Sequence, residues 1–252
     1  MDRVKKLVHY WDNDQNKERI TGKGVTAAVL DTGLAIHPDF KGRVIGWQDF
    51  INRKRQCYDD NGHGTHVAGI LAGSGRMSNG ILAGIAPECD LVIVKVLDKR
   101  GEANVESILA GIRWVASNYE RYGIRIVNLS AGAGKDLNTV KENWLIQAVE
   151  HLWNLGLVVI VSAGNNGPGE GTVVVPGTSR KVITVGAVKT EKMESDGCSG
   201  NGPTKECVVK PDLVAPGVGI TAAAPGGGYD TKSGTSMAAP FVTGSAALLM
   251  QW

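Results

Sequence analysis

Three side chains that could together activate a nucleophile stand far apart in this sequence. Ser236 lies in the run Ser233 to Pro240, directly before an apolar stretch of small residues that predicts a buried helix. A hydroxyl at a helix amino terminus lies in the positive field of free N–H groups, which favours an alkoxide-like oxygen and a neighbouring oxyanion. An ordinary helix cap uses the same residue type. The serine alone therefore does not decide between the two roles.

An aspartate follows the first long apolar run. Val25 to Leu30 predicts a buried strand, and Asp31 comes directly after it, before a turn that contains Gly33. In doubly wound parallel sheets, ligands bind at the carboxyl edge, where such a residue lies. Aspartate is also a common turn former, so a structural role stays open.

A histidine between two glycines begins a predicted helix. His63 is flanked by Gly62 and Gly64, which allow a sharp turn and a close approach to the ring. His66 follows three residues later on the same helix face, so a zinc site is an alternative. The metalloprotease pattern, however, needs an i, i+4 histidine pair with a glutamate between, and that glutamate is absent.

The three residue types fit nucleophilic catalysis. A serine is a poor nucleophile at neutral pH and needs a base, which a neutral imidazole near its usual pKa of about 6.5 supplies. An aspartate on the other ring nitrogen fixes the tautomer and stabilises the imidazolium. Asp31, His63 and Ser236 also stand in one of the chain orders known to build this geometry. Cys57 lies near His63 but has no base or orienting residue of its own.

The sequence around these residues resembles the subtilisin-like serine proteases, the subtilase family, and among them the bacterial intracellular type. The resemblance runs from about Gly22 to Met250. It includes five further segments in family order, which are Gly84–Pro87, Val92–Leu97, Val127–Gly132, Ser162–Gly167 and Lys210–Gly217. It implies a serine endopeptidase of broad specificity that forms an acyl-enzyme on Ser236, acts on peptides or proteins and needs no cofactor for its chemistry.

The resemblance also implies the remaining site residues. The oxyanion would bind the side-chain amide of Asn165 and the backbone N–H of Ser236. An extended substrate would pair with two backbone edges, which consist of Ser130, Ala131 and Gly132 on one side and Gly101, Glu102 and Ala103 on the other. Val174 stands where many relatives have a very small residue, which predicts a shallower pocket for the residue before the scissile bond.

Other family features depart from the pattern. Many relatives bind calcium in a loop that matches Gly73–Gly80, but this segment has no carboxylate. A structural calcium ion is therefore not indicated. A propeptide or a protein inhibitor is an expected partner, yet only a short leader, Met1 to Thr21, precedes the matching region. The chain ends at Trp252, so its carboxyl end is expected to be shortened relative to the family.

Composition excludes several functions. The chain has 252 residues, is 42% hydrophobic and has a net charge of +2, which gives no case for nucleic acid or a membrane as partner. The amino end lacks the apolar core of a secretion signal. The four cysteines form no CxxC pair and predict free thiols in the cytoplasm, although Cys198 and Cys207 could form a small loop disulfide. A processed mature form of a secreted protein is the alternative.

Apolar runs alternate with helical patterns along the chain. This predicts an α/β fold with a mainly parallel twisted sheet between two helical layers, in a single peptidase domain over residues 1–252. The segment Thr190–Lys210 predicts a surface excursion. Predicted strands are Val25–Leu30, Val44–Trp47, Leu91–Leu97, Ile124–Leu129, Leu157–Val161 and Val182–Val188, and predicted helices are Thr65–Ala72, Val105–Tyr122, Thr139–Leu155 and Thr235–Met250.

Two other functions use the same fold. A catalytically silent relative could act as a regulatory or binding protein, but such proteins lose a member of the triad, and Asp31, His63, Ser236 and Asn165 are all present. An esterase or acyl-transfer enzyme would use the same site.

Overall fold

The computed structural model describes residues 20–131, 138–189 and 197–252. Most of the predicted leader, Met1 to Thr21, lies outside these ranges. The described chain forms a seven-stranded sheet in the order β2-β3-β1-β4-β5-β6-β7, and all its strand pairs are parallel. Its strands are β1 (Thr26–Asp31), β2 (Val44–Asp49), β3 (Asp90–Lys95), β4 (Ile124–Leu129), β5 (Val158–Ser162), β6 (Ile183–Val188) and β7 (Leu213–Pro216).

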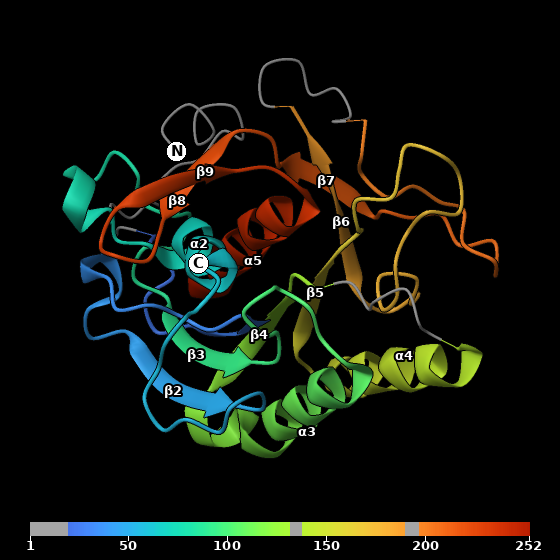
Figure 1. The fold of residues 1–252 in the computed structure, drawn as a ribbon, viewed down its shortest axis with the longest axis horizontal. Coiled ribbons are helices and arrows are strands. Elements are labelled where there is room, and N and C mark those ends of the chain that lie inside the picture. The colour runs from blue at the N-terminus through green and yellow to red at the C-terminus, as the bar shows by residue number, and fades with distance from the viewer. Residues whose placement is uncertain (1–19, 132–137, 190–196) are drawn as a thin grey trace.

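Helices cover both faces of this sheet (Figure 1). On one face lie α2 (His63–Ala72) and α5 (Thr235–Gln251), and on the other lie α3 (Val105–Tyr122) and α4 (Thr139–Asn154). Each face has its own hydrophobic core, and β1 serves both, because Ala27 and Val29 pack on one side and Ala28 and Leu30 on the other. The predicted three-layer α/β fold is confirmed.

Three strands were not predicted from the sequence. They are β7 and the antiparallel pair β8 (Ile220–Ala223) and β9 (Tyr229–Lys232), which lies against α2. Each has only four residues, so none shows a long apolar run, and the first two residues of β7, at the sheet edge, are exposed. Two short 3₁₀ helices, η1 (Pro38–Phe40) and η2 (Arg76–Ser78), complete the described elements. No helix of the described ranges combines the length and apolar character needed to traverse a bilayer.

The predicted surface excursion Thr190–Lys210 is only partly on the surface. Residues 190–196 lie outside the described ranges, but Ser199 and Lys210 are buried. The ammonium group of Lys210 donates to the carbonyl of Val182 at 2.8 Å and binds a carboxylate oxygen of Asp212 at 2.6 Å. The prediction is therefore wrong for the end of this segment, because a lysine can be buried when its charge is paired.

A single side chain joins the start of β1 to the end of α5. The side-chain oxygen of Gln251 accepts the backbone N–H groups of Thr21, Gly22 and Lys23 at 2.7, 2.6 and 3.1 Å. The two ends of the described chain are thereby fastened to each other.

The strand order places Asp31 at a distinctive point. The strand β1 lies between β3 and β4, with β3 and β2 on one side and β4 to β7 on the other, so the direction in which successive strands are added reverses at β1. Ligand sites of open parallel sheets form at the carboxyl ends of strands where the order reverses in this way. Asp31 ends β1 there, level with Lys95 on β3, while Leu30 is level with Leu129 on β4.

Candidate active site

The structure brings Asp31 and His63 into direct contact. The Nδ1 atom of His63 lies 2.7 Å from Oδ1 of Asp31, whose side chain is fully buried. The same carboxylate oxygen accepts the backbone N–H of Thr32 at 2.7 Å. A carboxylate accepts hydrogen bonds, so Nδ1 is the protonated ring nitrogen and Nε2 is free to act as a base. A quarter of the His63 side chain is exposed, which leaves this nitrogen accessible.

Two glycines permit this contact. Gly33, with φ +115°, has room for no side chain, because a Cβ atom there would lie 2.0 Å from the carbonyl oxygen of Tyr58. A Cβ atom on Gly64 would lie 2.3 Å from the carbonyl oxygen of Gly33. The amino end of α2 can therefore lie directly on the turn after β1. Gly64 is therefore needed for close packing of the backbone, whereas the sequence analysis had assigned the glycines beside His63 to close approach of a substrate to the ring.

A second carboxylate fixes the histidine loop. Asp59 accepts the N–H groups of Asn61, Gly62 and Thr65 at 3.0, 2.8 and 2.9 Å, and the hydroxyl of Thr65 at 2.7 Å. Burial alone would raise the pKa of Asp59, but these hydrogen bonds outweigh it and hold the pKa below its usual value. A charged Asp59 at the amino end of α2 also interacts favourably with the helix dipole.

These two carboxylates set the basicity of the histidine. Burial alone would lower the pKa of His63, but the charge and hydrogen bond of Asp31, with a further contribution from the charge of Asp59, raise it above the usual value. The surroundings thus favour the imidazolium that a general base becomes.

A fully buried lysine supports the other side of this contact. The Nζ atom of Lys95 donates to the carbonyl of Thr32 and binds Oδ1 of Asp60 at 2.7 Å, and it lies 5.0 Å from the centre of the Tyr58 ring. It therefore ties the turn after Asp31 to the loop before His63.

Ser236 is the second residue of α5, as predicted, and is half-buried. Its hydroxyl donates to the carbonyl oxygen of Ser130 at 3.1 Å. Ser130 follows β4, the neighbour of β1, so the serine lies over the strand next to Asp31. Among the described residues no hydrogen bond joins this hydroxyl to His63, which differs from the expected arrangement. Such bonds are often long or absent before a substrate binds.

Asn165 is held by the residue that precedes the serine. Its Oδ1 atom accepts the N–H of Thr235 at 3.0 Å and the hydroxyl of Thr235 at 3.2 Å. That hydroxyl also accepts the N–H of Gly164 at 3.1 Å. Because a backbone N–H can only donate, Oδ1 must face Thr235, and the exposed Nδ2 group remains to bind an anion.

The expected substrate residues differ in exposure. On one edge, Gly101 and Glu102 are exposed and Ala103 is half-exposed. On the other edge, Ser130 and Ala131 are buried, and Gly132 lies outside the described residues.

Val174 packs directly on Gly164, the residue before Asn165. A Cβ atom on Gly164 would lie 2.7 Å from the Val174 methyl groups. Val174 therefore contacts the residue that directly precedes Asn165.

The alternative metal and thiol sites do not form. The Nε2 atom of His66 lies 3.0 Å from the carbonyl of Ile220 and 3.1 Å from that of Asp230, so this ring faces the β8–β9 hairpin. Burial raises the pKa of the Cys57 thiol to about 12, which makes a thiolate nucleophile unfavourable there. Across the described ranges, no group of three or more His, Cys, Asp or Glu side chains could hold a metal ion.

The segment Gly73–Gly80 contains no carboxylate of its own, and the nearest one described is contributed by Asp39. The carboxylate that contacts it, Asp39, accepts the N–H of Met77 at 3.1 Å on one oxygen and the hydroxyl of Tyr229 at 2.9 Å on the other.

Sequence reasoning missed Asp59, Lys95 and Thr235 as supporting residues. A lysine at the end of the apolar run Leu91–Val94 is a usable signal, since an unpaired lysine is rarely buried. Asp59 and Thr235 lie beside residues already singled out, but their hydrogen bonds depend on the folded loops.

Comparisons with known proteins agree with this geometry. The family model described as the Subtilase family matches residues 22–252. Serine protease AprX of Bacillus subtilis (strain 168) is 42% identical over 275 residues, an alignment covering 100% of this chain and 62% of that protein. An intracellular serine protease of Paenibacillus polymyxa is 39% identical, with 91% of this chain and 68% of that protein covered.

Two solved structures share the fold. Sphericase superposes with a TM-score of 0.81 at 30% sequence identity, covering 98% of this chain and 82% of that chain. A cold adapted subtilisin-like serine proteinase gives a TM-score of 0.76 at 34% identity, covering 96% and 82%. The chain spans less than two thirds of the length of AprX. A family match over nearly the whole chain, together with these identities, shows that the chain belongs to the subtilase family.

Proposed function

We propose that this chain is a serine endopeptidase that hydrolyses peptide bonds through an acyl-enzyme on Ser236. The observation that carries the proposal is the 2.7 Å contact between His63 and the buried carboxylate of Asp31. The asparagine expected to bind the oxyanion, Asn165, has its amide oxygen held by Thr235, which leaves its amide nitrogen free. The named serine proteases among its relatives support the same activity.

In this mechanism Nε2 of His63 takes the proton of Ser236 while Oγ bonds to the substrate carbonyl carbon. The resulting oxyanion accepts hydrogen bonds from Nδ2 of Asn165 and the N–H of Ser236. The imidazolium is stabilised by Asp31 and gives its proton to the leaving amine as the peptide bond breaks. Water then attacks the acyl-enzyme with His63 again as base, which frees the acid product and returns the proton to Ser236.

The hydroxyl of Ser236 must change its partner before it attacks. It is bound to the carbonyl of Ser130, which belongs to one of the two expected substrate edges. A substrate N–H that donates to this carbonyl would compete with the hydroxyl. Rotation about the Cα–Cβ bond of Ser236 then redirects the hydroxyl towards His63.

A fluorophosphonate probe tests the proposal directly. We expect the full chain to be labelled at Ser236, as mapped by mass spectrometry, and to digest casein. The Ser236→Ala variant should lose both properties while keeping its circular dichroism spectrum. A folded protein that is not labelled, or that is labelled but cleaves only esters, would contradict an endopeptidase.

We also propose a shallow pocket for the residue before the scissile bond. The methyl groups of Val174 support this, because they lie against Gly164 beside Asn165. Peptides with Leu or Ala at that position should be cleaved faster than those with Phe or Tyr, and Val174→Gly should reverse the order. An unchanged preference in that variant would refute the role.

The remaining expectations follow the same reasoning. We propose one peptidase domain, a cytoplasmic location, and a propeptide or protein inhibitor that binds the same two edges as the substrate. A relative named intracellular serine protease supports the location. Fractionation of the source cells would test it, and recovery from the medium alone would contradict it.

A further inference from the structure

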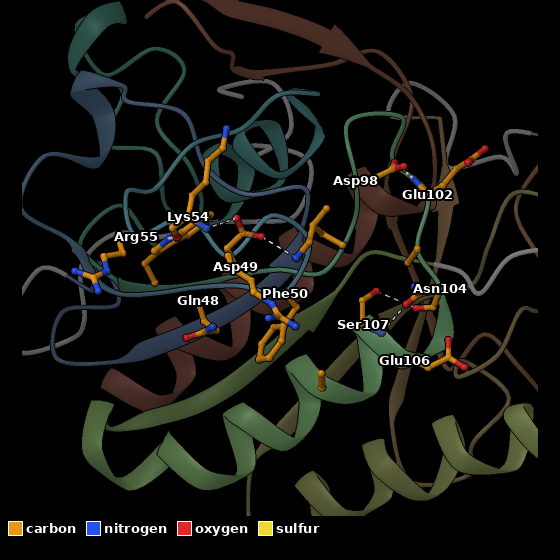
Figure 2. Close-up of a pocket in the computed structure, with 15 residues that line it drawn as sticks. Gln48, Asp49, Phe50, Lys54, Arg55, Asp98, Glu102, Asn104, Glu106 and Ser107 are labelled. Atoms are coloured by element: carbon orange, nitrogen blue, oxygen red, sulfur yellow. Dashed lines mark hydrogen bonds between the residues drawn. The ribbon is translucent and has the colours of Figure 1, made fainter.

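A large pocket lies behind one of the expected substrate edges. It has a volume of about 1060 Å³ and is lined by the loop after β2, the loop after β3 and the start of α3. Glu102 and Ala103 belong both to this lining and to the expected substrate edge. The pocket therefore continues from the edge, and its volume matches that of sites that hold ligands of several hundred daltons. Figure 2 shows the residues that line it.

One wall of the pocket is basic. Arg53, Lys54 and Arg55 are consecutive and exposed. Lys54 lies over the Tyr58 ring at 4.3 Å, but among the described residues none of the three forms an ion pair. The buried Asp49 fixes their loop by accepting the N–H groups of Ile51, Asn52 and Lys54 at 2.8, 3.0 and 3.0 Å.

The other wall is acidic. Asp98 accepts the N–H groups of Arg100 and Glu102 at 2.8 and 3.0 Å, and the backbone of Asp98 donates to the carbonyl of Glu102 at 2.8 Å. The loop is therefore held in shape while the carboxylate of Glu102 has no partner among the described residues. Glu106, also on this wall, is already paired with Lys141 at 3.2 Å.

The acidic wall is tied to the catalytic histidine. The side chain of Asn61 donates to the carbonyl of Lys99 at 3.1 Å and accepts the N–H of His63 at 3.1 Å. Because Glu102 belongs both to the acidic wall and to the expected edge, a chain bound along Gly101–Ala103 meets the acidic wall before it reaches the basic one. Figure 2 shows Lys54 and Arg55 on one side, Asp98 and Glu102 on the other, and Phe50 and Ser107 between them.

We propose that this pocket binds the part of a polypeptide substrate that extends beyond the paired edge, away from the scissile bond. This rests on the proposed endopeptidase function. The pocket selects a segment with a basic residue nearer the edge and an acidic residue further out, because unpaired charges of opposite sign face each other across it. A polyanion does not fit, since the acidic wall would repel phosphate groups.

Two matched peptides test the proposal. Both carry the same cleavable sequence and differ only at the fifth and seventh residues before the scissile bond, with glycine at the sixth in both. The first peptide has lysine at the fifth position and glutamate at the seventh, and the second peptide has these two residues exchanged. At low salt we expect the first to be cleaved with a kcat/KM about 2- to 30-fold higher, as expected for two exposed ion pairs. In 1 M salt the preference should vanish.

The double variant Arg53→Ser, Arg55→Ser should reduce this ratio substantially. As a matched control, Arg121→Ser, Arg125→Ser removes the same charge near the amino end of β4 and should leave the ratio unchanged. Equal cleavage of the two peptides by the unmodified protein, or an unchanged ratio in the Arg53/Arg55 variant, would overturn the proposal.

Binding separates this proposal from the proposed function. Fluorescence anisotropy on the Ser236→Ala variant should show the same ratio in Kd without any turnover. If the two peptides differ in Kd but the unmodified protein cleaves neither, the endopeptidase function is refuted and the proposed role of the pocket is retained. Cleavage of both peptides at the same rate, with equal Kd values, would refute the pocket alone.

Discussion

The replacement Thr235→Val tests how the proposed oxyanion site is held. Thr235 is fully buried, and its hydroxyl binds both Asn165 Oδ1 and the N–H of Gly164. Valine has nearly the same shape but makes neither bond. The Gly164 N–H loses its acceptor, which costs about 1–3 kcal/mol of stability and lowers Tm by roughly 2–12 °C.

The effect on catalysis should be smaller than removing the asparagine. Asn165 keeps the N–H of Thr235 at 3.0 Å but loses a second donor. One hydrogen bond contributes about 0.5–1.5 kcal/mol, so kcat should fall about 2- to 13-fold with little change in KM. Losing the amide itself costs about 10²- to 10³-fold in kcat, a magnitude known from subtilisin, a member of this family.

Steady-state kinetics on a chromogenic peptide, with calorimetry on the same samples, measures both effects. Thr235→Ser is the matched control, because it keeps the hydroxyl and loses only a methyl group. We expect its kcat to stay near that of the unmodified protein. The reasoning fails if valine leaves kcat unchanged, or if serine lowers it as far as valine does.

Three further perturbations test the supporting residues. Asp59→Asn removes a charge that raises the pKa of His63, so the rise of the acylation rate with pH should move to lower pH; an unmoved midpoint in stopped-flow measurements would show that Asp59 acts through structure alone. Lys95→Met should lower the unfolding free energy by about 1–3 kcal/mol, since it leaves the carbonyl of Thr32 and the carboxylate of Asp60 without the buried ammonium group, whereas Lys141→Met at an exposed pair should change it by less than about 1 kcal/mol; equal losses in denaturant titrations would contradict this. A calcium chelator should leave Tm unchanged, because Gly73–Gly80 has no carboxylate and the described residues contain no group of three or more His, Cys, Asp or Glu side chains that could hold a metal ion; a fall in Tm on chelation would contradict this.

Long periodic segments were predictable from the sequence. The ranges of α3 and β4 agree with the prediction at both ends, because each has an uninterrupted apolar pattern. The glycines next to Asp31 and His63 were predicted to allow sharp turns, but the close contact between the backbones of Gly33 and Gly64 was not predicted, because the glycines beside His63 had been assigned to substrate access. The four-residue strands β7 to β9 were not predictable, since their pairing depends on neighbours distant in sequence.

The site was predictable only as a set of residue types. The contact between Asp31 and His63 followed from their places at the ends of β1 and the start of α2. The hydrogen-bond partner of the Ser236 hydroxyl could not be predicted, because rotation of the side chain can direct a hydroxyl group to different acceptors and no sequence pattern specifies that rotation. The hydrogen bonds of Asp59 and Lys95 were hidden for a similar reason, as both depend on loops whose shape is set by tertiary packing.

The last helix has a consequence for when the molecule can first cut a peptide. Its first turn carries Ser236, and near its last turn Gln251 fastens the backbone that leads into β1, a contact across 229 positions of the chain. Contacts of such long range are slow to form, because the intervening chain must be ordered first. Until they form, the polypeptide has neither its attacking oxygen in place nor a secured first strand under Asp31. For the proposed endopeptidase, the ability to cut a peptide would therefore appear only once the fold is closed, and an immature chain would be protected from cleavage by its own site.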